Sequence, residues 1–181
     1  DASPLAYNRA ALYSGKALDF DGVNDSVSVG TLSGEVYATT FLTYTDANIT
    51  ASTSTQTLIN FATGSGNEAF KFGVSTGFLT DETFSILLPN SARVGIDKTI
   101  PKGWNFWAVC WDGSTYKIYQ NGQEQETITN GTASVISMGL VELGKEGSGQ
   151  YFNGSLSNFK VYSTALTAAQ IADLYNFPEK I

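Results

Sequence analysis

The chain of 181 residues contains no histidine and a single cysteine. Without histidine it lacks the commonest general base, the Ser-His-Asp and Cys-His nucleophile systems, and histidine-ligated transition metals. Its one cysteine, Cys110, excludes an internal disulfide and a multi-cysteine zinc site. Cys110 lies in the apolar run Trp104–Trp111, where we expect a buried, unreactive thiol. These absences argue against most classes of enzyme, and we predict no catalytic residues.

Positive charge is scarce as well. Ten Lys and Arg residues stand against 17 Asp and Glu, which gives a net charge of -7, and no basic run occurs. Nucleic acids and anionic membranes need a concentrated basic surface, so we expect neither as a partner. No apolar run approaches the roughly 18 residues of a membrane-spanning helix. The acidic balance is typical of an extracellular, cell-surface or virion-surface protein, where like charge keeps molecules apart.

Short runs rich in Val, Ile, Phe, Tyr and Thr make up most of the chain, and Gly, Asn, Asp or Ser closes each of them. This pattern is typical of antiparallel strands. In Val36–Tyr44, Phe41 falls on one face and Leu42 on the other, whereas Trp104–Trp111 is apolar on both faces, as in a central strand. The predicted strands are Ala17–Phe20, Ser26–Val29, Val36–Tyr44, Thr57–Ala62, Phe70–Ser75, Phe84–Leu88, Asn105–Trp111, Thr115–Gln120 and Leu156–Tyr162.

Turn and capping residues add two local predictions. Asp112-Gly113 and Asn121-Gly122 are turn signals that join a three-stranded meander from about residue 105 to residue 127. Near the end of the chain, Thr167 and Gln170 have the spacing of a capping box, and Pro178 is a helix stop. We therefore expect one short C-terminal helix packed on a β-sandwich.

Two pairs of acids have the spacing that places both carboxylates on one face of a strand: Asp19 with Asp21, and Glu124 with Glu126. Catalysis by paired carboxylates needs the two groups about 5–9.5 Å apart across a groove. The first pair brackets Phe20 in the block of residues 15–25, to which we assign a structural role below, and the second follows a hairpin on a polar strand. We predict a catalytic role for neither pair.

Three blocks of the chain carry motifs of one family. At the start, Gly15–Asp25 reads GKALDFDGVND, which is similar to the signature G-x-A-L-x-F-D-G-x-N-D. In the middle, Gly103–Gly113 and Lys117–Gly122 resemble a W-x-x-V-A-V-T-W-D-G…L-Y-V-D-G meander. At the end, Phe152–Tyr162 and Ala165–Ile171 resemble F-D-G-x-I-D-x-V-R-I-Y…A-L-S-x-E-E-I. In order and spacing, these blocks resemble the laminin-G-like, concanavalin A-like jelly-roll domains.

The resemblance implies an all-β fold: an antiparallel two-sheet jelly-roll sandwich with one short C-terminal helix, formed as a single domain by residues 1–181. The same sandwich serves lectins, adhesins, enzyme-appended modules and polysaccharide-cleaving enzymes, so it does not by itself imply a function. The E-x-D-x-x-E arrangement of the jelly-roll glucanases is absent from the sequence, as are the Arg- and His-bearing motifs of the related lyases. Both absences argue again against an enzyme.

Members of this family often hold calcium at the loop of the first block. There, Asp21, Asn24 and Asp25 supply the carboxylate and amide oxygens that Ca²⁺ prefers. The family completes the site with an acid from a late strand, where this sequence has Ser157 followed by Asn158. We expect a weak structural Ca²⁺ site formed by Asp21, Asn24, Asp25 and Asn158. The alternative is an Asx-rich turn that bonds its own backbone.

Carbohydrate binding needs aromatic faces ringed by amide and carboxylate groups. The chain has 3 Trp, 9 Tyr and 11 Phe, and most of them, Trp104 and Trp107 included, match core positions of the sandwich. Tyr116, beside the Asp112-Gly113 turn, and Tyr151, in a glycine-containing loop, are the aromatic residues least obliged to be buried. We therefore predict these two tyrosines as carbohydrate contacts.

The sequence favours a non-catalytic extracellular recognition module that binds glycans or a glycosylated surface, as in lectin-like adhesion. The alternative is a structural subunit of a virion, fibre or surface assembly that self-assembles and takes no small-molecule ligand. A lectin-like module needs a polar-rimmed aromatic groove, whereas an assembly subunit needs an apolar patch or an open sheet edge. The sequence alone locates neither surface.

Overall fold

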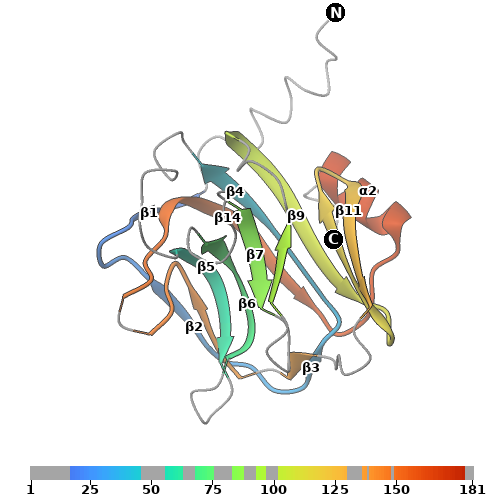
Figure 1. Ribbon diagram of the computed structural model, residues 1–181, viewed down its shortest axis with the longest axis horizontal. Helices are drawn as coiled ribbons and strands as arrows, with labels where there is room; N and C mark the ends of the chain where they lie inside the picture. Colours follow the sequence, from blue (N-terminus) through green and yellow to red (C-terminus); the bar gives the residue numbers. More distant parts are fainter. Residues whose placement is uncertain are drawn as a thin grey trace, which may run out of the picture.

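The computed structural model describes residues 17–45, 56–62, 68–75, 83–87, 93–96, 102–129, 136–137, 139–147 and 149–177 (Figure 1). Gly15, Lys16, Leu88 and Pro178 of the predictions above lie outside these residues. No helix in these ranges is long and apolar enough to span a membrane. The elements are β1 (Leu18–Asp21), β2 (Val27–Thr31), β3 (Glu35–Val36), β4 (Ala38–Thr45), β5 (Gln56–Ala62), β6 (Glu68–Ser75), β7 (Thr83–Leu87), β8 (Arg93–Ile96), β9 (Gly103–Trp111), β10 (Thr115–Gln120), β11 (Gln123–Thr129), β12 (Ile136–Ser137), β13 (Leu140–Leu143), β14 (Asn153–Tyr162) and α2 (Ala168–Asn176).

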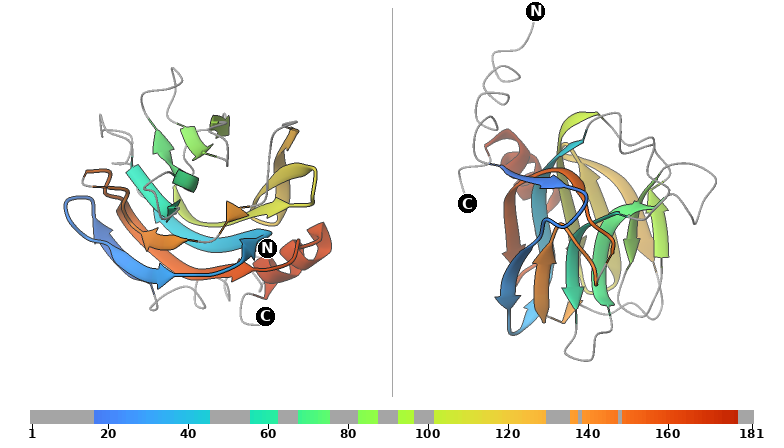
Figure 2. Two further views of the ribbon diagram at one scale, coloured as in Figure 1. Left: turned by 90° about the horizontal axis from the view of Figure 1, so that it is seen from below. Right: turned by 90° about the vertical axis from the view of Figure 1, so that its left-hand side faces the viewer.

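Two six-stranded antiparallel sheets form the body of the protein. Sheet A has the strand order β1-β14-β4-β9-β10-β11, and sheet B has the order β2-β13-β5-β6-β7-β8. The short strands β3 and β12 pair separately. The sheets pack face to face, and α2 lies outside sheet A, on the side away from sheet B (Figure 2). The predicted antiparallel jelly-roll sandwich with a short C-terminal helix is confirmed.

Aromatic side chains fill the space between the sheets. Phe41 of β4 and Trp107 of β9 contact Phe72 of β6, with ring centroids 4.9 and 5.4 Å from that of Phe72. All three side chains are buried. Burying one such side chain stabilises the folded state by about 1.5–3 kcal/mol, and a tilted ring pair adds roughly 0.5–1.5 kcal/mol. These contacts fix the position of sheet A on sheet B.

Strand β9 is buried on both faces, as its apolar sequence predicts. It lies in the middle of sheet A, between β4 and β10. Alternate side chains therefore enter two different apolar clusters. The residues that face sheet B are Trp107, Val109 and Trp111, and those that face the helix side are Phe106, Ala108 and Cys110.

Helix α2 covers part of the outer face of sheet A. The predicted capping box is present: Thr167 Oγ1 accepts the N–H of Gln170 at 3.2 Å, and Gln170 Oε1 accepts the N–H of Thr167 at 2.9 Å. Ile171 and Leu174 are the buried residues of the helix. Cys110 belongs to the same cluster, and burial raises the pKa of its thiol to about 11. The thiol is therefore protonated at neutral pH, as expected for an unreactive core cysteine.

An Asx turn at Asp112 and a two-residue Asn-Gly turn connect the strands of the meander β9-β10-β11. Asn121 and Gly122 both have positive φ, 51° and 79°, as a two-residue hairpin turn of this type requires. Asp112 Oδ1 accepts the N–H groups of Thr115 at 2.8 Å and Ser114 at 2.9 Å. These hydrogen bonds, the one from Thr115 above all, hold the pKa of Asp112 well below its usual value. The predicted meander is confirmed together with both turns.

The sequence did not predict β8, β12 or β13. Strand β13 nevertheless lies inside sheet B, between β2 and β5. It has only four residues, in which Val141 and Leu143 are buried and Leu140 is exposed. An alternation this short gives no clear period-two signal. The strand forms because β2 and β5 supply hydrogen-bonding partners on both of its sides.

Candidate functional site

The structure places Tyr116 in the core. Its ring is fully buried and lies 4.7 Å from the ring of Trp111. Burial also raises the pKa of its hydroxyl well above the usual value. Strand alternation points Tyr116 and Ile118 toward sheet B, although Tyr116 lies only four residues after the turn residue Asp112. Tyr116 therefore cannot offer its ring to a ligand at the surface, and this part of the prediction is wrong.

Tyr151 lies in the loop that joins β13 to β14 and is half-buried. The next residue, Phe152, is fully buried, and its N–H donates to the carbonyl of Gly144 at 2.9 Å. This hydrogen bond joins the two ends of the loop, and Tyr151 lies next to one of them. Carbohydrate contact by Tyr151 stays a prediction.

Four polar side chains hold this loop on sheet B, and we call them the loop clamp: Thr57, Lys71, Glu146 and Gln150. Lys71 Nζ forms an ion pair with Glu146 Oε2 and donates to Gln150 Oε1 at 3.3 Å. Thr57 Oγ1 lies 3.3 Å from Glu146 Oε2 and 3.2 Å from Gln150 Oε1. The backbone N–H of Thr57 also donates to the carbonyl of Gln150 at 3.1 Å. The loop is therefore tied to β5 and β6 by side chains and by backbone.

The loop clamp is buried on the outer face of sheet B. Phe70 and Phe72 of β6 enter the core between the sheets, so Lys71, which lies between them, points the other way. The Lys71 and Glu146 side chains are only 9% and 14% exposed. Asn60, paired with Lys71 in register, is also buried, and its Oδ1 has no hydrogen-bond partner in the described part of the chain.

Sequence reasoning missed the loop clamp. The run Phe70-Lys71-Phe72 carried a signal, because its alternation predicts that Lys71 faces away from two core residues. Glu146 and Gln150 carried none, because they belong to a loop and approach Lys71 only through the pairing of β13 with β5. Their sequence separations from Lys71 are 75 and 79 residues.

Three of the predicted metal ligands share the loop between β1 and β2. Asp21 Oδ1 accepts the N–H groups of Val23 at 2.8 Å and Asn24 at 3.2 Å, and Asp25 Oδ2 accepts the N–H of Asp21 at 3.0 Å. The bond from Val23, more than the others, lowers the pKa of Asp21. These contacts are those of an Asx-rich turn, the alternative to a metal site.

Asn158 lies elsewhere. Asp21 pairs with Asn153 in register, and Asn158 is five residues farther along β14, roughly 16 Å away at about 3.3 Å per residue. At the irregularity between Ser157 and Lys160 in β14, Asn158 has a φ of 50°. Within the described ranges no group of three or more Asp, Glu or Cys residues is arranged to hold a metal. The Ca²⁺ site stays a prediction, and the structure does not bring Asn158 to it.

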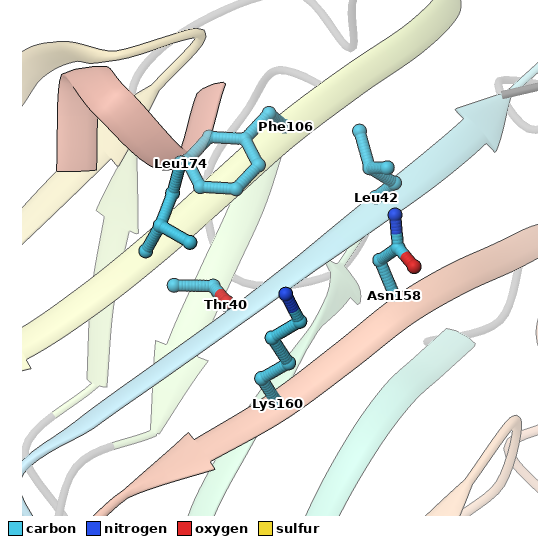
Figure 3. Close-up of a pocket in the computed structure, with 6 residues that line it drawn as sticks. All are labelled: Thr40, Leu42, Phe106, Asn158, Lys160 and Leu174. Carbon is cyan, nitrogen blue, oxygen red and sulfur yellow. The ribbon is translucent and has the colours of Figure 1, made fainter. Parts of the chain in front are cut away.

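The side chain of Asn158 instead borders a small cavity on the outer face of sheet A (Figure 3). The cavity has a volume of about 10 Å³, room for no more than one water molecule. It is therefore too small for a sugar, and it marks the place where α2 stops covering the sheet. Its lining residues are Thr40, Leu42, Phe106, Asn158, Lys160 and Leu174.

Next to this cavity, four side chains form a line across sheet A, which we call the aromatic row: Asp19, Ser155, Tyr44 and Trp104. They are direct register partners on β1, β14, β4 and β9, so all four project from one face of the sheet. Tyr44 is 40% exposed and Trp104 is half-buried. Their ring centroids are 5.5 Å apart, and the ring planes are inclined by 57°. The structure thus places an aromatic pair at the surface.

The other end of the aromatic row is polar. Ser155 Oγ donates to Asp19 Oδ1 at 2.6 Å. The next register pair, Asp21 with Asn153, lies on the same face, and Asp19, Asp21 and Asn153 are all exposed. The two carboxylates point to one side, as their spacing predicted, because Phe20 between them is buried. Aromatic rings beside carboxylate, hydroxyl and amide groups provide the chemistry of sugar recognition.

The family model described as the concanavalin A-like lectin/glucanases superfamily matches residues 20–172 of the chain. The match covers all three motif blocks of the sequence, except for residues 15–19 of the first block. No curated protein matches the chain in sequence.

Several solved structures share the fold. A heptameric SAP-like pentraxin from Limulus polyphemus aligns with a TM-score of 0.67 at 20% identity, over 87% of this chain and 80% of its own. Domain 4 of an extracellular arabinanase from Geobacillus stearothermophilus, in complex with arabinotriose, gives 0.67 at 20% identity over 90% and 78%. The CBM40 of the Ruminococcus gnavus IT-sialidase, bound to α2,3-sialyllactose, gives 0.64 at 13% identity over 89% and 97%. At these identities the likeness shows the fold alone.

The loop clamp gives a stability prediction. Glu146→Ala leaves the Lys71 ammonium buried without its carboxylate, and breaking a buried ion pair costs about 3–5 kcal/mol. We expect the free energy of unfolding, measured by urea denaturation, to fall by about 3 kcal/mol. Lys117→Ala is the control, because the Lys117–Glu124 pair at 3.6 Å is 38% and 42% exposed, and exposed pairs contribute about 0–1 kcal/mol. Equal losses in the two variants would contradict the prediction.

The placement of Asn158 gives a second prediction. If the loop between β1 and β2 binds Ca²⁺, Asp21→Asn should abolish the difference in melting temperature between millimolar Ca²⁺ and EDTA. Asn158→Ala should leave that difference unchanged, because its side chain lies too far from the loop. A wild-type protein that melts at the same temperature in both buffers would contradict the calcium site, and loss of the difference in Asn158→Ala would contradict the placement.

Proposed function

The chain belongs to the concanavalin A-like lectin/glucanases superfamily, and from that premise we propose that it is a non-catalytic carbohydrate-binding module. The observation that carries the proposal is the aromatic row, in which Tyr44 and Trp104 stand beside Asp19 and Ser155 on one sheet face. Domains of the same fold that hold arabinotriose and α2,3-sialyllactose support it.

Three of the described carboxyl groups are unsuited to the role of a general acid. A glycosidase needs a general acid whose pKa is raised, so that it is protonated at working pH. At Asp21 and Asp112, backbone N–H donors lower the pKa instead. At Glu124 the hydrogen bond from the Thr127 hydroxyl is the main cause of a lowered pKa. All three groups are shifted in the direction opposite to that of a general acid.

We propose an extracellular setting in which the module binds glycans or a glycosylated surface, as in adhesion. The net charge of -7 and the single, buried cysteine support this setting, since a protein with these features stays dispersed and offers no exposed thiol to oxidation. A weak structural Ca²⁺ held by Asp21, Asn24 and Asp25 is part of the same proposal.

Removing the exposed ring tests the proposal. We expect Tyr44→Ala to raise the dissociation constant for a bound glycan about tenfold, because it loses one aromatic contact of roughly 1.4 kcal/mol. A glycan array identifies the ligand, and isothermal titration measures the affinity. Phe177→Ala is the matched control, since Phe177 is 46% exposed but lies outside the row. A folded protein that binds nothing on a broad array would contradict the proposal.

A second function, as a subunit of a larger assembly, is favoured by a specific observation. β1 and β2 are edge strands of sheets A and B. Apolar residues are exposed on these strands and on the loop that joins them: Leu18 of β1 is 49%, Val23 of the loop is 67% and Val29 of β2 is 44% exposed. Open strand edges with apolar side chains favour pairing with another chain. The pairing would take place through this edge of the sandwich.

The molar mass of the protein in solution tests whether it assembles. If the edge pairs with a second copy, light scattering after size exclusion should give a multimer for the wild type and a monomer for the Val23→Lys/Val29→Lys variant, because buried lysines disrupt an apolar contact. A wild-type protein that stays monomeric at high concentration would contradict the second function and leave glycan binding as the proposal.

A further inference from the structure

The charge and hydrogen-bonding capacity of the aromatic row select among sugars. We infer that the row binds a neutral oligosaccharide laid across β1, β14, β4 and β9, and that it discriminates against sialylated and uronic-acid glycans. The inference rests on the proposed function. It adds the binding site, the orientation of the bound oligosaccharide across the strands and the chemical class of the ligand.

The size of the row favours an oligosaccharide over a single sugar. Four adjacent strands of sheet A contribute one residue each. At about 4.8 Å between strands, the distance from β1 to β9 is roughly 14 Å. The Tyr44 and Trp104 rings occupy one end and Asp19 with Ser155 the other. A ligand that uses both ends therefore has to be longer than one pyranose ring.

The aromatic end recognises the apolar face of a sugar. Tyr44 and Trp104 are inclined by 57°, so they form an angled surface and cannot both lie flat under one ring. The π-face of an aromatic ring is electron-rich, and it attracts the weakly positive C–H groups of a pyranose. This contact needs no charge on the ligand.

The polar end consists mainly of acceptors. Ser155 Oγ already donates its only hydrogen to Asp19 Oδ1, so both side chains can only accept further hydrogen bonds. Sugar hydroxyl groups donate and therefore match this end. The carboxylate of a sialic or uronic acid only accepts, so it finds no donor in Asp19 or Ser155. The exposed amide of Asn153, in the neighbouring register pair, offers N–H groups there.

The negative charge at the polar end of the row also disfavours anionic sugars. Asp19 places an exposed carboxylate on the face of β1 that carries this end of the row. This carboxylate repels an anionic sugar at this end of the row. Among the residues that the structure describes, the lysines nearest along these strands are Lys102, just before β9, and Lys160, five residues beyond Ser155 on β14. Neither lies at the polar end.

Matched glycan pairs test the inference. The probes are neutral oligosaccharides and the same oligosaccharides capped with α2,3-linked sialic acid or with a uronic acid, titrated against the intact protein. We expect the neutral member to bind at least tenfold more tightly. Asp19→Asn should weaken neutral binding about fivefold and reduce the neutral preference to about twofold, because it removes a charge and adds a donor. Lys102→Ala should change neither.

The outcomes distinguish a failure of the proposed selectivity from a failure of the proposed carbohydrate binding. Acidic glycans that bind as well as their neutral counterparts, or better, would overturn the selectivity while leaving carbohydrate binding intact. Neutral binding that is unchanged in both Asp19→Asn and Tyr44→Ala would show that the sugar lies elsewhere, and would overturn the site. Absence of binding to every probe, in a protein shown to be folded by its thermal melt, would overturn carbohydrate binding itself. Asp19 is exposed, so its variant is expected to fold.

Discussion

Burial of β9 on both faces is the constraint on which the rest of the structure depends. Trp107 fills the space toward sheet B, while Phe106 and Cys110 point the other way. A strand that is apolar on both sides has to be covered twice, so the fold needs a second sheet on one side and α2 on the other. A nine-residue helix is too short to cover a six-stranded sheet. Part of the outer face of sheet A is therefore left open.

The aromatic row follows from this incomplete cover. Trp104 is the β9 residue just beyond Phe106 on the helix side, and Tyr44 is its register partner on β4. Because the row stands on paired strands, hydrogen bonds of the sheet fix its spacing before any ligand arrives. A preorganised surface loses little conformational entropy on binding. The row therefore has an acceptor-rich end and an aromatic end, the arrangement from which we infer a neutral oligosaccharide as the ligand.

The loop clamp stabilises a different part of the molecule. It lies on the outer face of sheet B, whereas the aromatic row lies on that of sheet A. The Lys71–Glu146 pair fixes the loop that carries Tyr151, and it does so at the cost of removing two charges from water. Because the two regions have no residue in common, changes in one should affect the other little.

The sequence by itself determined the fold class, the two-sided burial of β9, the turns at Asp112 and Asn121, and the capping box at Thr167. The burial of β9, the turns and the cap depend on residues close together in the chain, where periodicity, turn chemistry and capping act locally. The jelly-roll fold, in contrast, was implied by the resemblance of three blocks spread along the chain to a known family. Only the tertiary structure decided which side chains meet across strands. Strand register brought the four residues of the aromatic row together and kept Asn158 away from Asp21. It also placed Tyr116 in the core and Lys71 beside Glu146. A strand shifted by one residue exposes the opposite set of side chains, and no local pattern records that choice.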